Sequence, residues 1–239
     1  MGARVKILIE GFTNAGSISE AGGEETQATI SLIRDGELVI VVDPGVLKSQ
    51  QILIDALQKE NLTVKDVNIV CITHSHIDHY RNIGMFSEAK ALEYYGIWDK
   101  NTTESLSENI TPNIQVLHTP GHDYTSITLF VNTEPETDYP GVIAICGDVF
   151  WKENYPEDPK DDPYALDYEK LRESRRMVLK RADWIIPGHG TIYKNDRNKF
   201  SQDSDPVEVV EILIFGICKK WHRVMQNKLD SCRCRPYFC

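Results

Sequence analysis

Six consecutive residues, His74-Ser75-His76-Ile77-Asp78-His79, bring three imidazoles and one carboxylate into a short stretch of the chain. Alternate side chains of an extended segment point to the same side, so His74 and His76 can face one way. Asp78 and His79 follow as the chain turns into its next element. Neutral imidazole and carboxylate are the ligand types that zinc prefers. A surface cluster without a ligand is the alternative, but this stretch holds three of the chain's seven histidines, which favours a metal site.

Three further candidate ligands each follow a predicted strand. His122 stands in a Thr-Pro-Gly-His stretch, Asp148 in Cys-Gly-Asp, and His189 in Pro-Gly-His-Gly. Each has a glycine beside it, which lets the backbone approach a metal closely. A single loop histidine would be weak evidence. The three together predict that the ends of several strands meet at one metal-binding site.

Apolar periodicity predicts the elements that must position these side chains. Two groups of strands interrupted by helices predict an α/β fold in which two sheets pack face to face with helices outside. Cys71 and Cys146 lie inside apolar runs, and we expect both to be small core residues. Strands are expected at Val5–Ile9, Thr26–Ile33, Leu38–Val42, Val67–Thr73, Asn113–Leu117, Ser126–Val131, Val142–Cys146 and Asp183–Pro187, and helices at Ser49–Leu62 and Tyr168–Arg181.

The His-x-His-x-Asp-His stretch, followed in order by Pro-Gly-His, Gly-Asp and Pro-Gly-His-Gly, resembles the metallo-β-lactamase superfamily over roughly residues 5–194. The resemblance implies an α/β fold of the αββα type, with two mixed β-sheets flanked by helices and the site at the sheet edges. It also implies a hydrolase domain over residues 1–200. Residues 201–239 are expected to form a C-terminal helix, with apolar residues over Val207–Trp221, and an irregular cysteine-rich tail.

The same resemblance implies a role for each candidate ligand. One metal would take His74, His76 and His122, and the second would take Asp78, His79 and His189, with Asp148 between them. Asp43, after the strand Leu38–Val42, would brace the metal loop without binding metal. Two zinc ions are expected, with iron or manganese as alternatives. An imidazole at His76, where oxygen-reducing di-iron members usually carry a carboxylate, favours zinc and hydrolysis.

The chemistry expected of two such metals is activation of water for hydrolysis. Asp78 and Asp148 are the expected catalytic carboxylates, Asp78 by orienting the nucleophile and moving its proton. His189 follows Asp148 by only 41 positions, which leaves no room for the cap domain of the capped nucleases. A non-catalytic metal-bound scaffold is less favoured because all seven candidate ligands are present.

The substrate is less well determined than the metal site. Gly147–Phe150 and Glu173–Leu179 are similar to a subgroup whose animal members are associated with endonucleolytic processing of histone pre-mRNA, which implies RNA phosphodiester bonds. A basic face on the second helix would suit such a strand, although basic residues also suit a helix C-terminus. That face would comprise Arg172, Arg175, Arg176, Lys180 and Arg181. Small ester, thioester, lactone or β-lactam substrates are the alternative.

Charge and loop composition favour the small-molecule alternative. The net charge of −10 repels polyanions at long range. The loop Phe150–Glu169 carries seven acidic residues against two lysines, with Trp151 and Tyr164. It is either a lid that selects neutral or cationic substrates or a solvated loop with no catalytic part. Glu20–Glu25 is a candidate second flap.

No targeting segment is evident at the N-terminus, which lacks the apolar core of a signal peptide. The longest apolar run, Ile212–Cys218, is too short to span a bilayer. We therefore expect a cytoplasmic protein with no membrane partner. The oligomeric state stays open, with a dimer allowed. The tail cysteines (Cys218, Cys232, Cys234 and Cys239) have no metal-site spacing, and a tail with oxidisable thiols is favoured over a metal site.

Overall fold

The computed structural model describes residues 2–15, 23–153 and 162–196. The C-terminal region 201–239, with its expected helix and four cysteines, lies outside the described residues, as do residues 20–22 of the candidate flap. No helix in the described ranges is long and apolar enough to cross a membrane.

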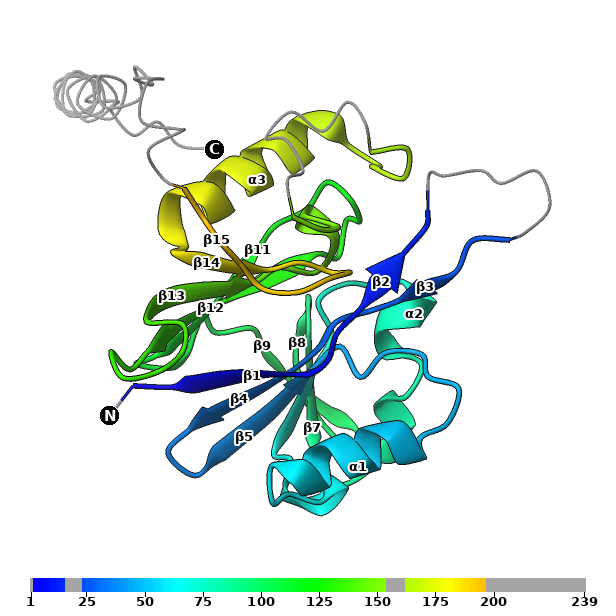
Figure 1. Cartoon of the computed structure of the whole chain (residues 1–239), viewed down its shortest axis with the longest axis vertical. Helices are drawn as coiled ribbons and strands as arrows, with labels where there is room; N and C mark the ends of the chain where they lie inside the picture. Colours follow the sequence, from blue (N-terminus) through cyan, green and yellow to red (C-terminus); the bar gives the residue numbers. More distant parts are fainter. Residues whose placement is uncertain (1, 16–22, 154–161, 197–239) are drawn as a thin grey trace, which may run out of the picture. The chain divides into compact units, whose positions relative to one another are not determined.

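Two β-sheets form the centre of the fold (Figure 1). The seven-stranded sheet has the order β1 (Arg4–Ile9), β4 (Ile30–Asp35), β5 (Leu38–Val42), β6 (Ile69–Cys71), β7 (Lys90–Glu93), β8 (Gly96–Asp99) and β9 (Thr102–Ser105). The six-stranded sheet has the order β10 (Asn109–Thr111), β11 (Ile114–His118), β12 (Ile127–Thr133), β13 (Gly141–Ile145), β14 (Trp184–Ile186) and β15 (Tyr193–Lys194). A separate ribbon pairs β2 (Phe12–Thr13) with β3 (Thr26–Gln27).

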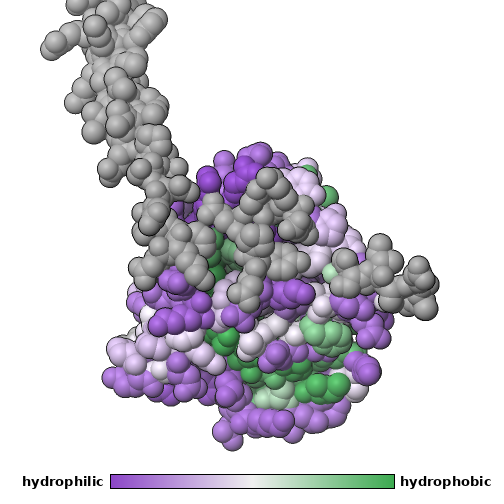
Figure 2. Space-filling view, turned by 45° about the horizontal axis from the view of Figure 1, so that its top comes forward, coloured by the Kyte–Doolittle hydropathy of each residue, from purple (hydrophilic) through white to green (hydrophobic). Residues whose placement is uncertain are grey.

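Helices cover the outer faces of the two sheets, α1 (Gln51–Lys59) on the first and α3 (Tyr168–Arg181) on the second (Figure 1). Strand alternation separates the two sides of the first sheet. Ile40 and Val42 of β5 belong to the core between the sheets, whereas Val41 packs with Leu53 and Leu57 of α1. The αββα sandwich expected from the resemblance is confirmed. On the face shown in Figure 2, hydrophilic residues predominate and apolar residues occupy a smaller area.

Strand direction explains why the candidate ligands gather at one edge. In the first sheet β5 and β6 run parallel. In the second, β13 and β14 run parallel, and β11 has the same direction because both β11 and β13 are antiparallel to β12. The loop after each of these strands carries one or more of the expected site residues. The carboxyl ends of parallel strands therefore bring residues far apart in sequence to one place.

The expectation of one continuous strand over Thr26–Ile33 is wrong. Thr26–Gln27 belongs to the small ribbon, and the chain joins the large sheet only at Ile30. Thr29 separates the two pieces, because its N–H donates to Gly188 O at 2.7 Å and its hydroxyl donates to Gly190 O at 2.7 Å. The segment is thus tied to the loop that carries His189 instead of pairing along its whole length.

Other boundaries were largely predictable. Helix α3 has the expected bounds, and Asp167 caps it by accepting a hydrogen bond from Lys170 N at 3.1 Å. Helix α1 is shorter than expected at both ends. Cys71 and Cys146 are buried in the core as expected, and burial raises the pKa of the Cys146 thiol to about 12. Short helical segments complete the fold: α2 (Ile77–Tyr80), η1 (Val64–Asp66), η2 (Ile83–Met85) and η3 (Gly147–Val149).

Candidate metal centre

The first group of expected ligands converges on a common point. The Nε2 atom of His74 lies 3.0 Å from Nδ1 of His76, and Nε2 of His122 lies 3.1 Å from the same Nδ1. Oδ2 of Asp148 lies 3.3 Å from Nε2 of His122 and 3.8 Å from Nε2 of His74. One ligand atom from each of the four residues lies within 4.8 Å of the others, so the four can share one ion.

The second group lies on the other side of the same aspartate. Oδ2 of Asp78 is 3.8 Å from Nε2 of His79 and 3.7 Å from Nε2 of His189. Oδ1 of Asp148 is 3.3 Å from each of these two nitrogens. Because Oδ2 of Asp148 is also 3.3 Å from Nε2 of His189, the carboxylate lies between the two groups and contacts both, the position expected of a bridging carboxylate.

Two observations show that the donor set fits a divalent cation. The Nε2 atom of His79 and the Oδ1 atom of Asp148 are buried without a hydrogen-bond partner. Buried polar atoms without a partner are costly, and a bound cation at this position would satisfy both. In addition, three imidazole nitrogens of the first group face one another at 3.0 and 3.1 Å, an arrangement that a cation between them would stabilise. Imidazole and carboxylate together suit zinc, and they also bind iron and manganese.

The electrostatics of His74 and Asp148 match this interpretation, whereas the Asp148 carboxylate raises the pKa of His79 and of His189. Burial lowers the pKa of His74 well below its usual value, and the neighbouring His79 lowers it further. Burial alone would raise the pKa of Asp148, but His189 and His79 outweigh it and hold that pKa well below its usual value. Near neutral pH His74 is therefore neutral and Asp148 ionised, which are the forms that bind a metal.

Comparison with known proteins places the chain in a family. The family model of the metallo-beta-lactamase superfamily matches residues 23–103. Metallo-beta-lactamase domain-containing protein 1 of Xenopus laevis is 32% identical over 200 residues, which cover 80% of this chain and 81% of the relative. The chain belongs to the metallo-beta-lactamase superfamily. It is a metallo-hydrolase of that superfamily with a cluster of histidines and aspartates that can bind metal.

Further members of the superfamily show similar relationships. The human protein of the same name is 30% identical over 166 residues, covering 65% of this chain and 59% of the relative. A metallo-beta-lactamase structure from Thermotoga maritima superposes with a TM-score of 0.63 at 20% identity, covering 81% of this chain and all of that one. An N-acyl homoserine lactone hydrolase with product bound at its metal centre superposes with a TM-score of 0.58 at 16% identity, covering 86% and 97%. These two likenesses show the fold.

Asp43 lies beneath the metal-binding loop, as the superfamily resemblance implied. Its Oδ2 is 2.9 Å from Nδ1 of His79, and its two oxygens accept hydrogen bonds from the Thr73 N–H at 2.8 Å and the Thr73 hydroxyl at 2.7 Å. A carboxylate at Nδ1 orients the ring so that Nε2 points at the metal. Asp43 adopts a φ of 50°, which is uncommon for a residue other than glycine and is typical of functional sites.

A side chain at position 188 would overlap the Asp148 carboxylate. A Cβ atom at this position would lie 1.7 Å from Oδ1 of Asp148. We expect Gly188→Ala to displace the Asp148 carboxylate and to lower turnover and metal content by about tenfold or more. Metal analysis and melting of the purified variant test this. Gly84→Ala is the matched control, because nothing lies within 4 Å of a Cβ there. Equal metal content in both variants would contradict the assignment.

Two contacts that hold metal ligands in place were not predicted from the sequence. Nδ1 of His189 lies 2.9 Å from Gln27 O, in the segment just before Thr29. Asp162 was counted among the acidic residues of a loop, but it is buried beside His122 and bound to Arg175, Oδ2 to Nη2 at 3.3 Å. No local sequence signal distinguishes Asp162 from its acidic neighbours.

The expected basic face of α3 needs correction, because Arg175 is fully buried and cannot contact RNA. Arg172 pairs with Glu169 at 2.8 Å, and Arg181 donates to Gln115 at 3.0 Å. Helix α3 is about 21 Å long, and its first turn packs against Gly121 while Arg181 lies at the opposite end. The basic residues of α3 therefore do not converge on the metal groups.

A pocket of about 260 Å³ opens onto both metal-binding groups. Trp151, Ile77 and Tyr164 give it apolar walls, and Glu24 adds a carboxylate. The Tyr164 hydroxyl donates to Oε1 of Glu24, and the Tyr164 ring lies 5.4 Å from that of Trp151. The loop Phe150–Glu169 thus contributes directly to the pocket where it is described, and Glu24 of the candidate flap does so from another segment.

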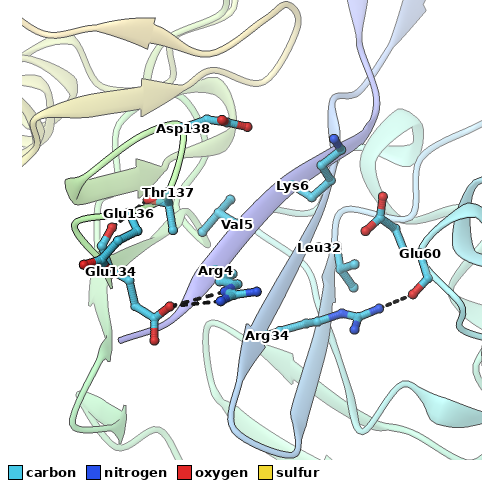
Figure 3. Close-up of a pocket in the computed structure, with 10 residues that line it drawn as sticks. All are labelled: Arg4, Val5, Lys6, Leu32, Arg34, Glu60, Glu134, Glu136, Thr137 and Asp138. Carbon is cyan, nitrogen blue, oxygen red and sulfur yellow. Dashed lines mark hydrogen bonds and ion pairs between the residues drawn. The ribbon is translucent and has the colours of Figure 1, made fainter. Parts of the chain in front are cut away.

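A second hollow, of about 380 Å³, lies where β1 begins and is shown in Figure 3. Its side chains largely contact the protein itself: Arg4 is 3.3 Å from Glu134, and Arg34 donates to the backbone oxygen of Glu60. None of the ten residues that line it is a histidine or a cysteine. We assign catalysis to the pocket at the metal-binding groups.

Proposed function

We propose that this chain is a dinuclear zinc hydrolase of small esters, thioesters or lactones that carry no negative charge near the reacting carbonyl. The observation that supports two metals is the position of Asp148, whose carboxylate lies between the two ligand groups and contacts both. When bound, two zinc ions supply water activated near neutral pH and a Lewis acid for the substrate oxygen.

The protein groups around that chemistry have distinct tasks. His74, His76 and His122 would hold one metal, and His79 and His189 with Asp78 the other. The Asp78 carboxylate is partly exposed to the pocket and accepts a hydrogen bond from the Thr26 hydroxyl at 3.0 Å. This position suits a group that orients the attacking water and accepts its proton at Oδ2. Trp151 and Ile77 would exclude water from one side of the substrate.

The pocket supports the choice of substrate class. Among the described residues that line it, none is Lys or Arg, so no cationic side chain there would add to the metals in binding a phosphodiester or a carboxylate. Glu24 would repel an anion. Apolar walls and a volume of about 260 Å³ suit a compact acyl or lactone group.

RNA phosphodiester hydrolysis is the second candidate. Tyr124, beside His122, is exposed, and Nζ of Lys170 lies 5.7 Å from the centre of its ring. Exposed aromatic rings with a nearby cation are used to stack bases of single-stranded nucleic acids. Tyr124 lies in the same loop as His122, and this pair favours RNA more than the five basic residues expected to form a face on α3 do.

Metal analysis combined with a substrate panel tests the proposal. We expect two zinc ions per chain and chelator-sensitive hydrolysis of neutral lactones and thioesters. Labelled single-stranded RNA and a chromogenic β-lactam are the competing substrates in the same assay. Faster chelator-sensitive turnover of RNA would support the second candidate instead. A chain that binds no metal would contradict both.

Glu24 gives a charge test of the pocket. We expect Glu24→Gln to raise kcat/KM for an anionic ester about three- to tenfold relative to its neutral analogue, because a repulsive charge is removed at an exposed site. The amide oxygen can still accept the Tyr164 hydrogen bond. Glu25→Gln is the matched control, since this neighbour makes the same charge change but does not line the pocket. Identical selectivity in the two variants would show that Glu24 does not select substrates.

A further inference from the structure

The Nδ1 atom of His122 faces two side chains that require opposite tautomers. The indole Nε1 of Trp151 lies 3.4 Å away and can only donate a hydrogen, which needs a lone pair on Nδ1. Oδ2 of Asp162 lies 3.6 Å away and, as a carboxylate, can only accept one. Because Nε2 of His122 is the atom that faces His76 and Asp148, metal binding needs the form with hydrogen on Nδ1. Asp162 lies beyond hydrogen-bond distance, so it favours that form through its negative charge and not through a hydrogen bond.

Asp162 is held in place as a carboxylate by a buried cation. Both Asp162 and Arg175 are fully buried, with Oδ2 and Nη2 3.3 Å apart. Arg175 is itself fixed, because its Nε donates to Val149 O at 2.8 Å and its guanidinium lies 5.3 Å from the Phe150 ring centre. Burying two charges is costly and is repaid only where geometry and further hydrogen bonds are good. The pair thus links the residue after Asp148 to the side of His122.

Backbone contacts tie the same segment to the His122 loop. The Leu166 N–H donates to His122 O at 3.4 Å, and the Asp167 N–H donates to Gly121 O at 2.9 Å. Oδ1 of Asp162 accepts from the Tyr164 N–H at 3.1 Å, and Tyr164 lines the substrate pocket. The Asp162 carboxylate therefore contacts the His122 ring with Oδ2, and with Oδ1 it contacts the segment of Tyr164 that forms the pocket wall.

We propose that Asp162, paired with Arg175, is a positioning residue that fixes His122 with hydrogen on Nδ1 and Nε2 open to the first metal, and that couples this ring to the pocket wall at Tyr164. This inference rests on the proposed function in one respect, the binding of metal by the first group. The tautomer of His122 in the metal-free protein is independent of it.

Two measurements on the full chain test the inference. Imidazole ¹⁵N shifts of the metal-free protein report the tautomer, and we expect hydrogen on Nδ1 of His122 in the wild type and a shift toward the other tautomer in Asp162→Ala. Zinc competition with a chromophoric chelator reports affinity, and we expect binding at the first group to weaken about 10- to 100-fold. Binding at the second group should stay within about twofold of the wild type.

Control variants separate positioning from stability. The double variant Asp162→Leu, Arg175→Met replaces the buried pair by apolar side chains, so it should fold and still lose zinc affinity at the first group. Asp167→Ala removes the cap of α3 without touching His122, so it should lower the melting temperature and leave the tautomer and zinc affinity unchanged. Wild-type tautomer and zinc affinity in the double variant would overturn the inference. Absence of zinc binding in the wild type would instead overturn the proposed function, and the ¹⁵N shifts would still decide the tautomer.

Discussion

Asp148→Ala is expected to lower turnover by more than about 100-fold and to reduce bound metal from two ions to at most one. Loss of a partner that merely supports a ligand typically costs 10- to 100-fold, and Asp148 contacts both ligand groups directly. Because Asp148 lies in the short η3 turn beyond the end of β13, its removal leaves the apolar core between the sheets intact. Metal analysis, steady-state kinetics and circular dichroism of the purified variant check the three parts of this expectation.

Asp35→Ala provides the control for this variant. Asp35 accepts hydrogen bonds from the Thr111 hydroxyl and from Nδ2 of Asn113 at 2.9 Å, at the opposite end of the strands from the metal groups. Its loss should lower the melting temperature without changing metal content. Two tightly bound metals and full turnover in Asp148→Ala would contradict the proposal that Asp148 bridges the two metals.

The candidate ligands were predictable because each lies in a local sequence pattern that can be recognised without the structure. His74, His76, Asp78 and His79 share one short loop, and each of the other three follows a strand within a glycine-containing turn. Given strands of common direction, their loops must meet at one edge. The structure brings all seven residues into two adjoining groups. Composition and spacing could therefore indicate where these residues gather before any contact was known.

The contacts that support the ligands were not predictable in the same way. Asp162 differs from its acidic neighbours only because Arg175, thirteen positions later on α3, places a cation beside it in the interior. Gln27 reaches His189 through a backbone carbonyl, which carries no sequence signature. Such partners depend on long-range packing, whereas propensity and periodicity report local preference.

Strands β9 and β10, each at one edge of its sheet, were not predicted, for a related reason. Strand β9 (Thr102–Ser105) is exposed along its whole length and β10 contains only three residues. An edge strand of this kind has no buried side that would impose alternating apolar residues. Pairing with β8 and β11, respectively, makes these segments strands. Strands β5, β6, β12 and β13 were predictable because burial dictates their composition, whereas the interior strand β7 was not among the expected strands.

Arg175→Met is expected to destabilise the protein by about 3–5 kcal/mol, the range for removing one partner of a buried ion pair. The substitution leaves the Asp162 carboxylate buried without its cation and takes the Nε donor from Val149 O. Urea unfolding of the metal-free protein, where metal binding does not contribute, gives the free energy of unfolding. The double variant with Asp162→Leu should recover most of the loss because no buried charge remains.

Arg172→Met makes the same substitution nearly one turn earlier on α3, on a side of the helix that water reaches. Its partner Glu169 is largely exposed, so the expected loss is below about 1 kcal/mol. The difference between the two arginine variants measures the buried contacts of Arg175, its ion pair with Asp162 together with its hydrogen bond to Val149 O, since helix, side-chain length and charge change are the same. Equal losses would mean that the interior around Arg175 is hydrated well enough to screen Asp162. A large loss at Arg175 alone would show that the ion pair beside His122 is desolvated, which is the condition for Asp162 to hold the ring firmly.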